Sequence, residues 1–111
     1  MNGFDDPQNV VISKEKAEEL ILHNAKEYYD CVVEKVGDVC NSNQIISLTS
    51  LCFNIGVNAF CRSTLLKVAK KNPHNFPEIE KQFMRWIYAD GSVNMGLRKR
   101  REEEVKIYRE L

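Results

Sequence analysis

An apolar stretch near the middle of the chain constrains the fold more than any other feature of the sequence. From Ile45 to Ile55 most side chains are apolar, and we interpret the segment as a helix that has no polar stripe to turn toward solvent. A helix without a polar stripe must be covered by neighbours around its whole circumference. Gly56 follows the stretch and suits the left-handed position that often ends a helix. We therefore predict a buried central helix, from about Gln44 to Asn54, inside a bundle.

The segments on either side of this stretch are amphipathic and can supply that cover. Residues 13–36 carry apolar side chains at helical spacing after a capping Ser13, which predicts one long helix that ends at Gly37. No segment alternates polar and apolar residues over the length of a strand. The fold class predicted is all-α, a compact helical bundle in which a turn over 57–60 separates the central helix from shorter helices over 63–71, 78–89 and 98–110.

Length and charge limit the organisation of the chain and its partners. With 111 residues it fits a single domain, made of an N-terminal loop (1–12), the long helix (13–36) and a helical lobe (44–110). The formal net charge is zero, so no general attraction to nucleic acid or an anionic membrane is expected. No apolar run approaches the roughly 20 residues of a membrane span, and the acidic N-terminus does not resemble a signal peptide. We expect a cytoplasmic protein of the host cell.

The cysteines and histidines give no metal or cofactor motif. Four cysteines, at positions 31, 40, 52 and 61, include no C-x-x-C pair, and the two histidines share no ligand spacing with them. Four reduced thiols are the expected state. A Cys31–Cys40 or a Cys52–Cys61 bridge stays open, because only geometry decides it. No metal and no cofactor are expected.

Several separate motifs follow one another along the chain. They are Leu51-Cys-Phe-Asn-Ile-Gly56, Ala59-Phe60, Ser63-Thr-Leu-Leu66, Phe83-x-Arg-Trp86, Gly91 and Gly96-Leu-Arg-Lys-Arg-Arg101-x-x-Glu104. In this order and spacing they closely resemble the C-terminal lobe of phage-type lysozymes, the endolysin muramidases. Residues 12–20 also look like the start of that family's long inter-lobe helix. The resemblance covers about residues 10–110 and implies a lysozyme-like helical lobe of phage or prophage origin.

The resemblance also implies where catalysis should be found. In the family, the catalytic glutamate and a Gly-Tyr-Gly-His-Thr-like hairpin lie upstream of the inter-lobe helix, whereas residues 1–12 here contain no glutamate. Glycoside hydrolysis needs one carboxylic acid that protonates the leaving oxygen and a second group that faces it. Glu102 and Glu103 follow a basic run, and Glu104 matches a family position that we interpret as structural, paired with Arg100 or Arg101. We assign no catalytic residue.

Two kinds of binding residue are candidates. Phe53 and Ser63 match positions that line the glycan cleft of the family, with core packing as the alternative for Phe53 and helix capping as the alternative for Ser63. A surface for a protein partner is predicted from Tyr28, Tyr29, Arg98, Lys99, Arg100 and Arg101.

Three functions remain open at this point. The first, which we prefer, is a non-catalytic lysozyme-like pseudoenzyme that binds a host or phage protein, for example as an inhibitor of a host enzyme or defence system. The second is part of a peptidoglycan-degrading muramidase whose catalytic segment lies on another chain or outside this sequence. The third is a remnant that only binds peptidoglycan.

Overall fold

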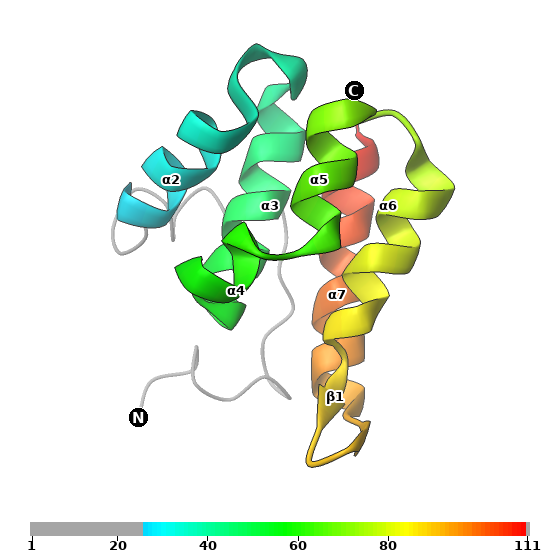
Figure 1. Ribbon diagram of the computed structural model, residues 1–111. Helices are drawn as coiled ribbons and strands as arrows, with labels where there is room; N and C mark the ends of the chain where they lie inside the picture. The colour runs from blue at the N-terminus through cyan, green and yellow to red at the C-terminus, as the bar shows by residue number, and fades with distance from the viewer. Residues whose placement is uncertain (1–25, 111) are drawn as a thin grey trace.

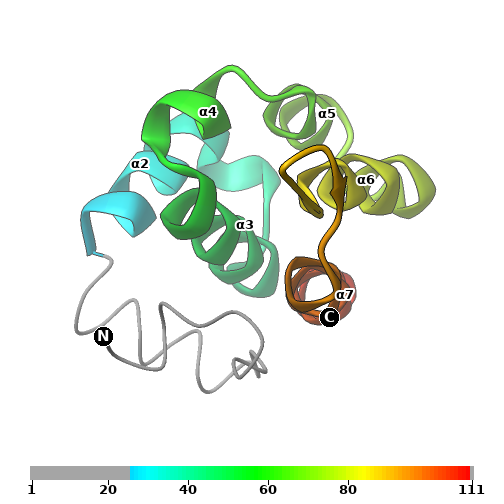
Figure 2. The ribbon, with the colours of Figure 1, turned by 90° about the horizontal axis from the view of Figure 1, so that it is seen from below.

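The computed structural model describes residues 26–110, and its helices surround one central helix, α3 (Ser42–Ile55). Helix α3 lies between α2 (Lys26–Val36) and α7 (Met95–Arg109), as Figures 1 and 2 show. Most of its side chains are buried, including Leu48 and Leu51 at 0% exposure. The buried central helix predicted from the apolar stretch is confirmed.

Specific residues determine where α3 begins and where it ends. The side-chain oxygen of Asn41 accepts a hydrogen bond from the Gln44 backbone N–H at 2.8 Å, and the Gln44 side-chain oxygen accepts one from the Asn41 N–H at 2.9 Å. This reciprocal capping box starts the helix two residues earlier than predicted. At the other end Gly56 has a φ of +96°, which side chains rarely allow, but its ψ of 153° lies outside the left-handed helical region.

Of the long helix predicted over 13–36, the structure describes only the second half. Helix α2 ends at Val36, as predicted, and a short 3-10 turn, η2 (Gly37–Val39), leads toward α3. The first half of the predicted helix over 13–36 and the predicted loop over 1–12 lie outside the described residues.

Three short helices follow α3. The turn predicted over 57–60 is instead a short helix, α4 (Val57–Cys61), in which Phe60 is fully buried and its N–H donates to the Gly56 carbonyl at 3.0 Å. Helix α5 (Thr64–Lys71) comes next, capped by Ser63. Helix α6 (Phe76–Phe83) carries a proline in its first turn, where its missing N–H costs no hydrogen bond.

The helix predicted over 78–89 ends earlier than expected. After α6 the chain forms a 3-10 turn, η3 (Met84–Trp86), and then an antiparallel hairpin of β1 (Tyr88–Ala89) and β2 (Ser92–Val93). Asp90 and Gly91 between the strands have φ values of +52° and +82°, as expected for an Asp-Gly hairpin turn. Strands of two residues are too short to show alternation in a sequence. The fold remains mostly α-helical.

Helix α7 closes the bundle. It begins at Met95, three residues before the predicted start, because the Asn94 side-chain oxygen accepts a hydrogen bond from the Leu97 N–H at 2.9 Å. The core that it completes contains Phe60, Phe83 and Tyr108, and Trp86 packs against this core but is only partly buried. Among the described helices, none combines the length and apolar character needed to cross a membrane.

Candidate functional site

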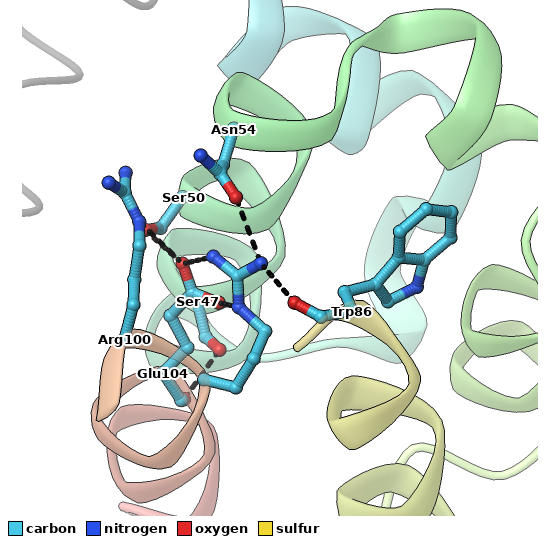
Figure 3. A network of polar contacts seen from close by, with 7 residues as sticks. Ser47, Ser50, Asn54, Trp86, Arg100 and Glu104 are labelled. Atoms are coloured by element: carbon cyan, nitrogen blue, oxygen red, sulfur yellow. Dashed lines mark hydrogen bonds and ion pairs between the residues drawn. The ribbon is translucent and has the colours of Figure 1, made fainter. Parts of the chain in front are cut away.

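A buried network of charged side chains joins α7 to α3 (Figure 3). The Arg101 Nε atom lies 2.6 Å from Glu104 Oε1, and Arg101 Nη2 donates to Glu104 Oε2 at 3.1 Å. On the same helix, Arg100 Nε lies 3.7 Å from Glu104 Oε2. All three side chains are at most 1% exposed. Burial lowers the pKa of Arg100, and the adjacent Glu104 acts in the opposite direction.

Helix α3 contributes three polar partners to this network. Ser50 Oγ donates to Glu104 Oε2 at 2.6 Å, and Ser47 Oγ donates to the Glu104 backbone carbonyl at 2.7 Å. Arg101 Nη1 donates to Asn54 Oδ1 at 2.9 Å and to the Trp86 carbonyl at 3.2 Å. Both carboxylate oxygens of Glu104 are therefore in use. The structural role predicted for Glu104 is confirmed.

The basic run 98–101 does not form one continuous surface, which corrects the predicted partner surface. Arg100 and Arg101 are 1% and 0% exposed, because they lie on the face of α7 that also carries Val105 and Tyr108 toward the core. Arg98 and Lys99 are exposed, and Arg98 Nε lies 3.4 Å from a carboxylate oxygen of Glu102 on the outer face. Only the first half of the run can meet a partner.

The aromatic residues of the predicted surfaces meet across α2 and α3. The ring centroids of Tyr28 and Phe53 lie 5.0 Å apart with an interplanar angle of 70°, an edge-to-face contact. Both rings are half-buried, as is Tyr29 on the same helix. Packing accounts for the buried part of Phe53, and its exposed part leaves glycan contact as a prediction.

Ser63 is engaged in helix capping. Its hydroxyl accepts a hydrogen bond from the Leu66 N–H at 3.1 Å and donates one to the Phe60 carbonyl at 2.7 Å. The residue is 6% exposed. The capping interpretation is confirmed. A glycan contact by Ser63 stays a prediction, and it would have to compete with both of these bonds.

A groove of about 490 Å³ between α6 and α7 brings three carboxylates together, which the sequence did not indicate. It is lined by Glu80, Met84, Glu102, Glu103, Val105, Lys106 and Arg109. Glu80 lies 3.6 Å from Arg109, and both are about half exposed, at 52% and 56%. The general acid of a glycosidase usually sits in an apolar environment that favours its protonated form. The α6–α7 groove is instead a solvated surface on which charged side chains are paired, so it does not favour a protonated carboxyl group.

Three thiols from three helices gather near the opposite side of α3. Burial raises the pKa of the Cys31 thiol, and the neighbouring Cys61 raises it further. Burial raises the pKa of Cys52 to about 12. Cys40 faces α5 instead, with its Sγ 4.0 Å from the Ala69 carbonyl oxygen, and burial raises its pKa to about 11. All four are free thiols, and within residues 26–110 no cluster of potential ligands is arranged to hold a metal ion.

The described residues thus form a helical lobe with a capped central helix and a buried Arg–Glu network. The family model described as phage lysozyme matches residues 4–104, so the chain belongs to the phage lysozyme family. The relationship expected from the motifs is thereby confirmed.

Curated relatives include several phage endolysins. The chain is 36% identical to the endolysin of Bacillus phage B103 over 96% of its own length and 40% of that protein. It is 42% identical to the SAR-endolysin of Escherichia phage Mu over 80% of its own length and 51% of that protein. The endolysin of Salmonella phage P22 is 31% identical over 95% of this chain and 70% of that protein. The chain thus spans two fifths to about half of the first two relatives, and these matches make it a lysozyme-like phage protein.

Proposed function

We propose that this chain acts on peptidoglycan as part of an endolysin, and that residues 26–110 form its helical supporting lobe. The observation that carries the proposal is the position of Glu104. It is the one fully buried carboxylate among the described residues, and Arg101 and Ser50 occupy its oxygens. Glu104 thus holds α7 against α3 and is not available to protonate a substrate. The lobe is built as a rigid support.

The proposal assigns the general acid to residues outside 26–110, either on this chain or on another. The carboxylates that line the α6–α7 groove include Glu80 and Glu102, which are about half exposed and lie beside Arg109 and Arg98. Such surface ion pairs contribute little energy and do not create the apolar setting of a general acid. What the lobe offers a glycan is a surface, for which the partly buried Tyr28–Phe53 pair is the best candidate.

Co-sedimentation with purified, insoluble peptidoglycan tests this function. We expect the full chain to pellet with peptidoglycan, and we expect Phe53→Leu to reduce the pelleted fraction several-fold because it removes the ring. Phe76→Leu is the matched control, because Phe76 is also half-buried but packs against Tyr108, with ring centroids 6.3 Å apart. Circular dichroism must first show both variants to be folded. Wild-type protein that stays in the supernatant, or an equal loss in both variants, would contradict the proposal.

A second candidate function, a non-catalytic module that binds a protein partner, is favoured by one surface. Tyr88 and Val93 are cross-strand partners in the hairpin and are 57% and 46% exposed, and nearby Met95 is 68% exposed. Met95, Arg98 and Lys99 also share a face of α7, because they are three and four residues apart. Clustered exposed apolar side chains are typical of protein interaction sites. A partner with an apolar, acidic surface, such as a host enzyme that the chain inhibits, would fit.

This second function predicts a partner whose binding depends on that surface. A protein retained from host extract by the wild type should form a defined complex on size-exclusion chromatography. The variant Tyr88→Ser/Met95→Ser should abolish the complex, whereas Val39→Ser, at another exposed apolar site, should not. A complex of unchanged stability with the double variant would contradict this assignment of the surface.

A further inference from the structure

Helix α5 and the residue that leads into it carry positive charges and no negative one. From residue 39 to residue 77 the sequence contains no aspartate or glutamate, but it contains four lysine or arginine residues. All four are exposed, and we call them the α5 basic surface: Arg62, Lys67, Lys70 and Lys71. Arg62 is the C-cap of α4, and the three lysines belong to α5.

The fold directs the lysines of α5 toward solvent. Helix α5 lies at the periphery of the bundle, where it contacts α6, α2 and α4 (Figure 2). Its buried side chains are all apolar: Leu65, Leu66 and Ala69. Lys67 is three residues before Lys70 and four before Lys71, so the three ammonium groups share one face of the helix. The eight residues of α5 spread this charge over about 12 Å.

The charges of the α5 basic surface are not neutralised within the protein. Elsewhere on the surface bases meet acids, as in the Lys26–Asp30 and Arg98–Glu102 pairs, but in the range 26–110 no carboxylate forms an ion pair with this surface. The helix dipole favours bases in a last turn, which accounts for Lys70 and Lys71 but not for Lys67. Like charges three or four residues apart weaken a helix slightly. Stability of α5 therefore does not explain the set.

The neighbouring side chains narrow the kind of anion that fits. None of the large apolar side chains that are exposed in the described part of the chain lies on α5, so a lipid bilayer would gain no inserted side chain there. Helix α5 also has no aromatic side chain on which the bases of a nucleic acid could stack. Recognition by charge alone remains, and a flexible chain of phosphates provides it.

We propose that the α5 basic surface binds a phosphodiester polymer that is attached to peptidoglycan. This inference rests on the proposed function, because that function brings the chain to the cell wall. Successive phosphates of the polymer pair with the ammonium groups along α5, and each contact releases a counterion. The polymer and the glycan belong to one material, so binding at α5 adds to binding at the Tyr28–Phe53 pair through a raised effective concentration.

The test is co-sedimentation of the full chain with two forms of one peptidoglycan preparation. One form keeps its covalently attached poly(glycerol phosphate), and hydrofluoric acid has removed this polymer from the other. At low salt we expect the wild type to bind the polymer-bearing form more tightly by about 10-fold or more, and we expect this preference to disappear at high salt because counterion release drives it.

Two triple variants, each without three exposed lysines, locate the effect. They are Lys67→Gln/Lys70→Gln/Lys71→Gln on α5, and the control Lys26→Gln/Lys81→Gln/Lys106→Gln on other helices. Both change the net charge equally. We expect the α5 variant to lose most of the preference for the polymer-bearing form, and the control to keep it. Both should bind the stripped form as the wild type does, and circular dichroism must show both to be folded.

The outcomes separate this inference from the proposed function. Equal binding of the wild type to the two forms would overturn the inference and leave the proposed function in place. Binding to the polymer-bearing form alone would support the α5 basic surface but contradict the proposed function. An equal loss of preference in the control variant would overturn the inference, because net charge would then be the cause. Tighter binding to phosphatidylglycerol vesicles or duplex DNA, lost in the α5 variant, would overturn the polymer as the occupant.

Discussion

The side chains of Arg101 and Glu104 meet on one face of α7, with Nε 2.6 Å from Oε1 and neither residue exposed to solvent. Charges removed from water are stable only when they are paired and hydrogen-bonded. Ser50 and Asn54 complete the arrangement from α3, so the network fixes the register of one helix against the other. Removing one partner of such an ion pair is strongly destabilising, because the other charge stays buried without a partner.

Glu104→Gln should therefore destabilise the protein strongly. The substitution removes the negative charge but leaves Arg100 and Arg101 in a buried setting, and we expect the free energy of unfolding to fall by about 3–5 kcal/mol. Urea denaturation measures this change. Glu102→Gln is the matched control, because Glu102 is 54% exposed beside Arg98, and its loss should cost less than about 1 kcal/mol. Similar decreases in the free energy of unfolding for the two variants would show that burial of the network contributes nothing to stability.

Ser63→Ala should lower stability by about 1 kcal/mol, because it removes the side-chain acceptor of the Leu66 N–H at the start of α5. Ser63→Thr should restore most of the loss, since threonine also caps helices and keeps a hydroxyl that can donate to the Phe60 carbonyl. Thr64→Ala, at the exposed neighbouring position, should have little effect. Thermal unfolding followed by circular dichroism compares the three variants. Weaker peptidoglycan binding by Ser63→Ala at unchanged stability would instead favour the glycan contact.

Tyr108 should make stability depend on pH in the alkaline range. Its hydroxyl donates to the Pro73 carbonyl at 2.7 Å, and burial raises its pKa above the ordinary value of 10.0. The unfolded chain then loses this proton at a lower pH than the folded chain does. The contribution to stability is complete below the unfolded pKa and is lost as the pH rises above it, at up to about 1.4 kcal/mol per pH unit.

Tyr108→Phe isolates this effect from other groups that titrate. At neutral pH the variant should be about 1 kcal/mol less stable, because the Pro73 carbonyl loses its donor. Between about pH 9 and 11 the wild type should lose stability faster than the variant, so the difference should shrink or reverse. Urea titrations at several pH values measure this difference in the free energy of unfolding. Parallel pH profiles would mean that Tyr108 ionises equally in both states.

The sequence predicted the helical core well because burial leaves a strong pattern. The apolar stretch ending at Gly56 and the stop of α2 at Val36 follow directly from periodicity and turn residues. The predicted helix starts are less accurate, because Asn41 and Asn94 each cap a helix that begins before the predicted start at Gln44 or Arg98. The hairpin was missed because its only local signal is Asp90-Gly91.

The candidate site was predictable only where it depends on one helix. The Arg101–Glu104 pair is visible in the spacing along α7, and the same spacing relative to Tyr108 would have indicated that Arg101 is buried. The Tyr28–Phe53 contact depends on how α2 packs against α3. Neither the packing angle nor the rotamer is encoded in local periodicity, so this pair required the structure.

The release of reducing ends from purified peptidoglycan tests most directly the claim that residues 26–110 support catalysis but do not supply the general acid. The informative comparison is between the wild type and Glu80→Gln/Glu102→Gln/Glu103→Gln, which neutralises the carboxylates of the α6–α7 groove. With equal Tm values, the two proteins should release reducing ends at the same rate. A loss of about 100-fold or more in the triple variant, the size expected for a lost acid, would contradict the claim.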